Sequence, residues 1–444
     1  MQHLRQCKVQ QPASNDENQV VDNLLDPDPP PVVEQFFWGE VRGSVIEADI
    51  NHCYEKIVHW KKNLFLLPNG STGKSYIREV TRLLNSWVDD SPLKVITMKA
   101  VHIMPALLLQ KVSKTSKSHD HVLTLERRMK LWHKGDIRSL LDECETIQSR
   151  LPKIENNKRD INFISKKFKE HMEKGNVNSA MNLLTNNMSG GILPLNDETL
   201  KTLTEKHPDA CEINEDVALQ GPIKPINPIV FDGIDETMIM KAAKMTKGGA
   251  GPSSMDAEGW RKLLASRMYG DTGRDLRKSF ANVIRKISTT EISDNSLEAF
   301  LACRLIPLDK CPGLRPIGVG EILRRISGKV VMFLSKADVM ESASDVQMCS
   351  GVNAGCEAAV HAMKFMFEQE ETEAVLLVDA ANAFNNINRK VLLHNIQISC
   401  PMLAQICHQL LHHTDAAFRN RGWRTAIKRG YNAGRSIGNG NICH

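Results

Sequence analysis

The sequence has no C-x-x-C pair, although it contains eleven cysteines. Closely paired cysteines are the usual sign of a zinc knuckle or a redox motif, and disulfide scaffolds are short secreted chains. We therefore expect reduced thiols in an intracellular protein. The closest groups have spacings that match no common zinc site: Cys349 with Cys356, and Cys400 with Cys407 and His408.

Long apolar runs are also missing. The polar N-terminal segment ends in the proline-rich stretch 26–31, and it contains no run long enough for a signal peptide or a membrane span. We expect no membrane partner and a location inside the cell, in the nucleus or the cytoplasm. The net charge of +5 is a mild excess for 444 residues, so charge alone selects no class of partner.

Apolar residues make up 41% of the chain, enough to form real cores, and from about 36 to 210 they recur at helical spacing. Two stripes predict consecutive helices, the second capped by Asp136: Val122, Leu125, Met129 and Trp132, then Ile137, Leu140, Leu141, Cys144 and Ile147. A third stripe, 161–172, has lysines on its other face, which we interpret as solvated surface. A short helix follows Asn196 and ends before Pro208.

The pattern changes after a proline-punctuated linker, 219–234. A helix is predicted from about Asp235 to Lys247, followed by a glycine-rich break at 248–252 and a helix containing Trp260. Farther on, the short apolar run 305–308 and the segment 315–317 (Arg-Pro-Ile) flank a Cys-Pro-Gly turn and predict a β-hairpin that leads into a helix.

The apolar run 374–378 lies between two predicted helices and is followed by Asp379. We expect a short buried strand and α/β packing. A carboxylate at the end of a buried strand can hold magnesium for phosphoryl transfer. Taken alone, an aspartate in this position is more often a turn residue or a helix cap.

The run 378–389 (VDAANAFNNINR) resembles motif A of reverse transcriptases, especially those of LINE-like, non-LTR retrotransposons. The segment 248–260 is similar to the loop that precedes the fingers in those enzymes. The segment 310–317 (KCPGLRPI), continuing to Arg324, Arg325 and Lys329, is similar to their fingers motifs. The three motifs follow the family order over about residues 235–411. The resemblance implies an RNA-directed DNA polymerase, a nucleotidyltransferase shaped like a right hand.

The resemblance implies an α+β chain in which a helical N-terminal region precedes the fingers and part of a palm whose sheet is incomplete. The expected division is a disordered leader (1–35), a helical upstream region (36–218), a linker (219–234), fingers (235–370), a partial palm (371–411) and a tail (412–444).

The resemblance also implies roles for individual residues. Asp379 would be the motif A carboxylate that binds the catalytic Mg²⁺, or Mn²⁺ in its place, helped by the carbonyl of Ala380. Phe384 occupies the steric-gate position, with a core aromatic as the alternative. Lys310 and Arg315 would contact the incoming triphosphate, since a guanidinium and an ammonium both bind phosphate oxygens. Three cations would contact nucleic acid or else be solvated: Arg324, Arg325 and Lys329.

The implied partners are an RNA template, a DNA primer and deoxynucleoside triphosphates; the sequence identifies no protein partner. A polymerase of this kind needs three carboxylates around two metal ions. Motifs B and C of the family, and with them the motif C aspartates, have no counterpart in the chain. We therefore expect a catalytically incomplete, truncated polymerase. The alternative is a non-enzymatic nucleic-acid-binding or interaction protein that keeps the fingers scaffold.

A third hypothesis is a P-loop nucleotidase built on residues 63–80, where 69–75 reads NGSTGKS. Backbone amides of a P-loop cradle phosphates, and its lysine reaches them. Pro68, however, stands where the pattern requires the first glycine, and proline has no amide donor. A polar loop is the competing interpretation.

The tail offers a reason for the missing motifs. From about 412 onward the sequence loses apolar periodicity and becomes basic. Back-translation of 429–444, read from the second base of each codon, permits the string EGTTQGDPLAMAIYA, which resembles motif B of the same family. We hypothesise that this tail is a frameshifted translation, which would be disordered or arbitrarily packed because it was never selected to fold.

The DNA of this segment tests the frameshift. We expect the neighbouring reading frame to encode Gln-Gly-Asp-Pro and to continue to the motif C aspartates within several hundred bases beyond the codon of His444. A neighbouring frame that encodes no such string would rule the frameshift out.

Overall fold

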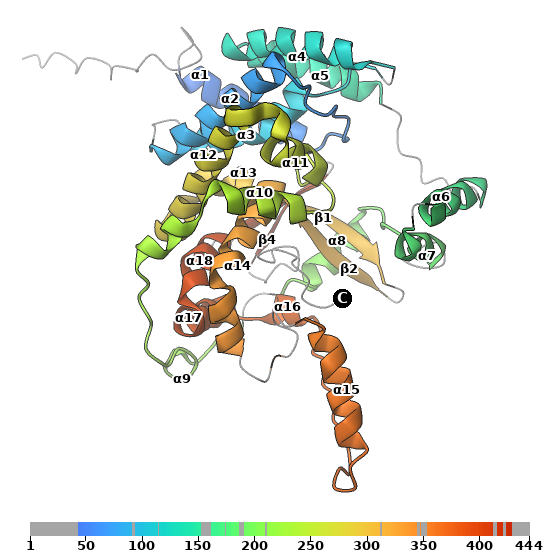
Figure 1. The fold of residues 1–444 in the computed structure, drawn as a ribbon, viewed down its shortest axis with the longest axis vertical. Helices are drawn as coiled ribbons and strands as arrows, with labels where there is room; N and C mark the ends of the chain where they lie inside the picture. The colour runs from blue at the N-terminus through green and yellow to red at the C-terminus, as the bar shows by residue number, and fades with distance from the viewer. Residues whose placement is uncertain are drawn as a thin grey trace, which may run out of the picture.

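The computed structural model describes residues 43–90, 94–113, 115–151, 161–173, 175–185, 191–208, 211–310, 313–343, 347, 353–411, 415–420 and 423–428. The described chain is predominantly helical with one small sheet, an α+β mixture (Figure 1). The leader expected at 1–35 lies outside the described residues. In the part that is described, no helix is long and apolar enough to cross a membrane.

The N-terminal helices follow the predicted apolar stripes. They are α1 (Gly43–Ile57), α2 (Ser71–Val88), α3 (Lys94–Leu108), α4 (Ser118–His133) and α5 (Ile137–Ser149). The stripe on α5 is buried throughout, and Asp136 caps this helix by accepting the Ser139 N–H at 3.2 Å. Both predicted helices are therefore confirmed, together with the cap.

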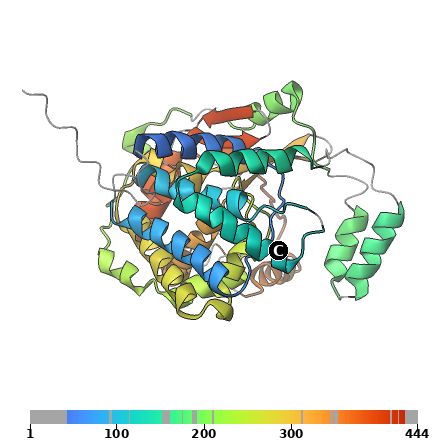
Figure 2. The ribbon, with the colours of Figure 1, turned by 90° about the horizontal axis from the view of Figure 1, so that it is seen from above.

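The third predicted stripe forms α6 (Ile161–Glu173), which packs against α7 (Val177–Thr185). This helical pair lies apart from the main body in both views (Figure 2). The short helix α8 (Asp197–Glu205) begins where predicted, because the Asn196 side chain accepts the Thr199 N–H at 2.8 Å.

The middle of the chain is again helical. Its elements are α9 (Glu215–Ala218), the 3₁₀ helix η1 (Pro228–Gly233), α10 (Glu236–Met245), α11 (Ala257–Ala265), η2 (Arg267–Tyr269), α12 (Gly270–Thr289) and α13 (Asp294–Leu301). Asp235 and Asp256 cap α10 and α11. The helices predicted on either side of the glycine-rich break at 248–252 are thus confirmed.

One hydrophobic core joins the N-terminal helices to those that follow the linker. Buried residues from Ile46 of α1 to Leu411 belong to a single cluster. Within it, α12 packs along α2 and α13 packs along α3, as the adjacent ribbons of Figure 1 show. The predicted linker at 219–234 therefore does not divide the core.

The sheet has the strand order β2-β1-β3-β4. The hairpin of β1 (Cys303–Asp309) and β2 (Leu314–Gly320) leads into α14 (Ile322–Ala343), as the sequence predicts. β3 (Asp415–Asn420) pairs in parallel with β1 at one position, Cys303 with Phe418, and antiparallel with β4 (Trp423–Lys428) along its length.

Two segments of the predicted tail, 415–420 and 423–428, form the last two strands of the sheet. Residues of β4 alternate between large or β-branched and basic or small types (Trp-Arg-Thr-Ala-Ile-Lys), the period that suits a strand in a hairpin. The rest of the predicted tail, 412–414, 421–422 and 429–444, lies outside the described residues.

The segment 353–382 forms a projecting arm. The chain runs outward through α15 (Gly355–Phe367) and returns to α16 (Ala383–Asn386) near the main body (Figure 1). The chain then re-enters the main body through α17 (Arg389–Ser399), η3 (Pro401–Leu403) and α18 (Ala404–Leu411), whose apolar side chains join the large core.

The buried strand predicted at 374–378 is not formed. These residues have no strand assignment, and Leu376, Leu377 and Val378 are 86%, 79% and 82% exposed. The physical reason is that a strand is stabilised by neighbouring strands, and within the described chain this segment pairs with none. The high strand propensity of this segment is therefore not sufficient to form a strand.

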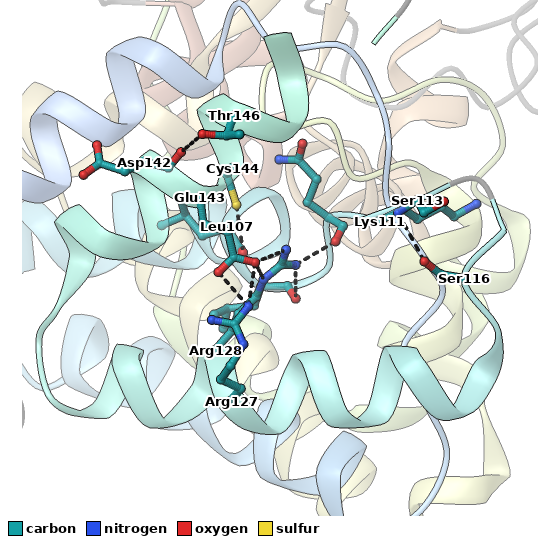
Figure 3. A network of polar contacts seen from close by, with 12 residues as sticks. Leu107, Lys111, Ser113, Ser116, Arg127, Arg128, Asp142, Glu143, Cys144 and Thr146 are labelled. Atoms are coloured by element: carbon teal, nitrogen blue, oxygen red, sulfur yellow. Dashed lines mark hydrogen bonds and ion pairs between the residues drawn. The ribbon is translucent and has the colours of Figure 1, made fainter. Parts of the chain in front are cut away.

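A buried arginine holds the N-terminal helices together (Figure 3). Arg128 of α4 is completely buried, and it donates to the carbonyls of Leu108 and Gln110 at 3.2 and 2.6 Å. It also donates from Nε and Nη2 to Glu143 of α5 at 3.0 and 2.8 Å. Arg127 reaches the same carboxylate from the solvent side. Burial alone would raise the pKa of Glu143, but the two arginines lower it overall.

We expect Arg128→Met to lower the free energy of unfolding by about 3 kcal/mol, because two carbonyls lose their donor and Glu143 loses its buried partner. The matched control Arg127→Met removes an exposed cation from the same carboxylate and should cost less than about 1 kcal/mol. Urea unfolding followed by circular dichroism measures both. Equal losses in the two variants would contradict the role assigned to Arg128.

Candidate functional site

The β1–β2 hairpin carries two of the predicted site cations. The strands pair antiparallel from Cys303 opposite Gly320 to Asp309 opposite Leu314. At the turn, Lys310 N donates to Gly313 O at 3.0 Å, and Gly313 has a φ of 94° that favours glycine. Lys310 and Arg315 are both exposed, so each can reach a phosphate group in solution.

The hairpin is held by the segment around α8. Cys303, Leu305 and Leu314 form a second, smaller core with Leu203 of α8. The chain just before α8 also runs along the edge of β1 that does not face β2, where Leu193 N donates to Pro307 O at 2.9 Å. Residues 191–205 therefore support the hairpin that carries the two cations.

Asp379 and Ala380 lie in the return segment of the arm and are both exposed. Among the described residues, no three His, Cys, Asp or Glu side chains gather in a way that could hold a metal ion. Two catalytic ions require several carboxylates at one point, so the residues around Asp379 do not by themselves fit a two-metal centre. The Asp379 carboxylate is accessible, but the described part of the chain brings no other carboxylates beside it.

The asparagines after Asp379 have structural roles. Asn382 is in the left-handed region with a φ of 50°, and its Nδ2 donates to the carbonyl of Lys206 at 2.8 Å. Asn385 donates to the Asn382 side chain at 2.8 Å, and Asn388 caps α17. Since Lys206 directly follows α8, Asn382 attaches the segment of Asp379 to the helix that packs on the hairpin.

Phe384, the predicted steric-gate residue, is 62% exposed. The alternative interpretation, a core aromatic, is therefore wrong. The ring lies in α16, five residues after Asp379 in the chain.

The structure corrects the prediction of nucleic-acid contacts for Arg324 and Lys329, which are both buried. Arg324 Nη1 donates to the carbonyl of Leu301 at 3.0 Å, and Nη2 lies 3.2 Å from the sulfur of Cys303. Burial, together with the nearby Arg325 cation, lowers the pKa of Lys329. Both cations lie in the first part of α14, where most side chains from Ile322 to Val331 are buried.

Arg325 is only partly buried, and it is also engaged within the fold. Its Nη1 donates to the carbonyl of Lys247 at 3.0 Å, and its Nη2 donates to the carbonyl of Gly249. Burial lowers the pKa of its guanidinium. The side chain therefore braces the glycine-rich loop (248–256), which limits its availability to a ligand.

Glu321 is a site residue that the sequence analysis missed. Its carboxylate is 1% exposed and accepts the Ser253 N–H and the Ser253 hydroxyl, each at 2.7 Å. A Cβ on Gly251 would lie 2.9 Å from the Glu321 backbone. The glycine-rich loop is thus clamped against the start of α14. The only sequence signal is a small-residue run, Gly-Pro-Ser-Ser, with nothing that identifies its partner.

The P-loop hypothesis is not supported by the backbone at 69–75. The helix α2 already begins at Ser71, and the amide of Lys74 donates to the carbonyl of Gly70 at 3.1 Å. That amide is therefore committed to the helix. A Cβ on Gly73 would lie 2.0 Å from the carbonyl oxygen of Pro68, so this glycine serves close packing.

Searches against protein-family models, curated proteins and solved structures returned no match.

We expect Gly251→Ala to destabilise the protein by about 2 kcal/mol, because the added methyl group cannot fit against the backbone of Glu321. Gly249→Ala is the matched control, since nothing lies within 4 Å of a Cβ at that position. Its effect should stay within about 0.5 kcal/mol. Thermal unfolding compares the two variants. A Gly251→Ala protein as stable as the control would contradict the clamp.

Proposed function

We propose that this chain is the upstream and fingers part of a retrotransposon reverse transcriptase, with a palm that begins around Asp379 and lacks the strands that would complete it. The proposed activity of the complete enzyme is template-directed deoxynucleotidyl transfer, dependent on Mg²⁺ or Mn²⁺. Its substrates would be an RNA template, a primer and deoxynucleoside triphosphates. The chain by itself would carry out no synthesis.

The observation that carries the proposal is the unpaired apolar segment 374–378 directly before Asp379. A run that is apolar on both of its faces is typical of a strand inside a sheet that is covered on both sides. Here both faces are in solvent, and no strand of the described chain lies alongside. This is what a palm strand without its neighbours would look like.

The two exposed cations of the hairpin support the same proposal. The planar guanidinium of Arg315 can bind two phosphate oxygens at once, and the ammonium of Lys310 supplies a mobile point charge. Both belong to a hairpin fixed by its own small core. They are suited to orient a triphosphate or a nucleic-acid backbone.

A second candidate is a non-enzymatic nucleic-acid-binding protein. It is favoured by one observation, the lack of a described carboxylate cluster at Asp379, because phosphate contacts need only positioned cations. The two candidates differ in whether Asp379 matters: binding alone does not require a carboxylate.

A version of the chain with its reading frame restored from about residue 412 through motif C separates the candidates in a primer-extension assay with Mg²⁺. We expect synthesis by the restored protein. Asp379→Ala should reduce it by at least about a thousandfold, as expected for loss of a metal-binding group, while leaving binding of the template and primer unchanged. Chelation of the metal should have the same effect.

In the same assay, the double variant Lys310→Ala/Arg315→Ala should raise the KM for deoxynucleoside triphosphates by about tenfold or more. Its control is Arg138→Ala/Arg274→Ala, which removes two cations that are 74% and 55% exposed and lie on α5 and α12, away from the hairpin. Synthesis that survives Asp379→Ala would refute the polymerase proposal. Template binding without any synthesis by the restored protein would favour the second candidate.

A further inference from the structure

The proline-rich segment between α9 and η1 has no role in the proposed polymerase activity. Its prolines recur at every third position, Pro222, Pro225 and Pro228, so that two overlapping P-x-x-P motifs share the middle proline. The proline ring fixes φ at about −65° and disfavours the helical region for the residue that precedes it. Both restrictions favour a polyproline II helix, in which three residues complete one turn.

The P-x-x-P segment (222–228) is extended and lies on the surface. Residues 222–227 belong to no helix or strand, and all three prolines are exposed. Asn227 has a φ of −74° and a ψ of 119°, in the extended region that includes polyproline II. Figure 1 shows this part of the chain as an open trace along the outer side of the main body, between α9 and α10. The segment therefore already has the kind of conformation in which proline-rich ligands are bound.

A three-residue period gives the segment three edges, and these edges have different surroundings. In the middle of the isoleucine edge, Ile226 is half-buried and packs against the large core. The proline edge and the edge formed by Lys224 and Asn227 are both exposed. A partner that approaches from solvent therefore meets these two edges, while the isoleucine edge stays on the protein.

Contacts with α17 hold the segment in place. The Lys224 N–H donates to the carbonyl of Gln397 at 3.4 Å, and His394 Nε2 lies 3.1 Å from the carbonyl oxygen of Gln220, just before the segment. Within the described chain, none of the carbonyl groups from 221 to 226 accepts a hydrogen bond. The segment is thus positioned before binding, which reduces the entropy lost on association, and its backbone acceptors are available to a partner.

We propose that the P-x-x-P segment is the docking site for a domain that has an aromatic-lined proline groove bordered by a carboxylate. Aromatic rings of the groove would pack against the proline edge, and their N–H or O–H groups would donate to the free carbonyls. Pro222 and Pro228 are separated by two full turns, about 19 Å along a polyproline II helix. The segment thus presents one proline ring to the groove on each of three successive turns.

Lys224 is the reason to expect a carboxylate beside the groove. Its side chain is exposed, and no acidic side chain pairs with it in the part of the chain that the structure describes. A carboxylate on the partner can accept a charge-assisted hydrogen bond from this ammonium group. The leader contains another P-x-x-P motif at 27–30, but that motif is accompanied by Asp26 and Asp28. An acidic border would repel the leader motif and so select the segment that contains Lys224.

Calorimetric titration of the full chain with a panel of purified SH3-type and WW-type domains tests the proposal. We expect binding to at least one SH3-type domain that has an acidic side chain beside its groove. Pro225→Ala removes the proline that both motifs share and should weaken this binding by at least about tenfold. The matched control Pro208→Ala removes an exposed proline outside the segment and should leave the affinity unchanged.

Two further variants test the charge and the location of the site. Lys224→Glu should weaken binding by about tenfold, because it places a like charge beside the carboxylate of the groove. Pro27→Ala/Pro30→Ala removes the leader motif and should have no effect. The side chains at 208, 224 and 225 are exposed, so circular dichroism should show unchanged folding in their variants.

Absence of binding to every domain of the panel would overturn the proposal, as would equal affinities of Pro225→Ala and Pro208→Ala. Loss of binding in the leader variant would overturn it by assigning the interaction to residues 27–30. An unchanged affinity of Lys224→Glu, or binding to WW-type domains alone, would overturn the carboxylate-bordered groove. These measurements involve no synthesis, so this proposal and the polymerase proposal fail separately.

Discussion

The carboxylate of Glu321 is the interaction on which the arrangement of the middle region depends. It sits between β2 and α14, and its hydrogen bonds to Ser253 hold the glycine-rich loop from inside the protein. The next residues of α14 continue the junction, because Arg325 reaches back to the start of the loop while Arg324 reaches the strand β1. A buried carboxylate is tolerated only when its oxygens are satisfied. The glycine-rich loop, the β1–β2 hairpin and α14 are therefore held together as one unit. The exposed cations of the hairpin lie on this unit.

The helices could be predicted from the sequence because their information is local. The stripe at 137–147 and the cap at Asp136 lie within a few residues of one another, and the structure contains both. The hairpin at 303–320 could be predicted for the same reason, since its turn and its two strands are contiguous in the sequence. Periodicity and capping operate over one or two turns of chain, and at that range the sequence is a sufficient guide.

The features that could not be predicted depend on contacts between distant residues. Glu321 and Ser253 are 68 positions apart, and the partners of Arg324 and Arg325 lie on other elements. A basic helix start looks the same in sequence whether its cations point into solvent or into a core. The strand predicted at 374–378 does not form for a related reason. Strand propensity describes the preference of a residue for a sheet, but the neighbouring strands must come from elsewhere in the chain. The two parts of the candidate site therefore differ in how firmly they are held. Lys310 and Arg315 lie on a hairpin that packs in its own small core, whereas the segment of Asp379 is anchored mainly through Asn382.

The N-terminal helices and the helices after the segment 219–234 share one hydrophobic core, and this limits how the chain can be divided in evolution. Because α12 lies along α2 and α13 along α3, each region supplies half of a common interior. Recombination between related genes at the proline-rich segment 219–234 would join surfaces that had not evolved against each other. The upstream helices and the region after them are thus expected to pass through evolution as one module, and any excised version of either would leave an apolar face without its counterpart.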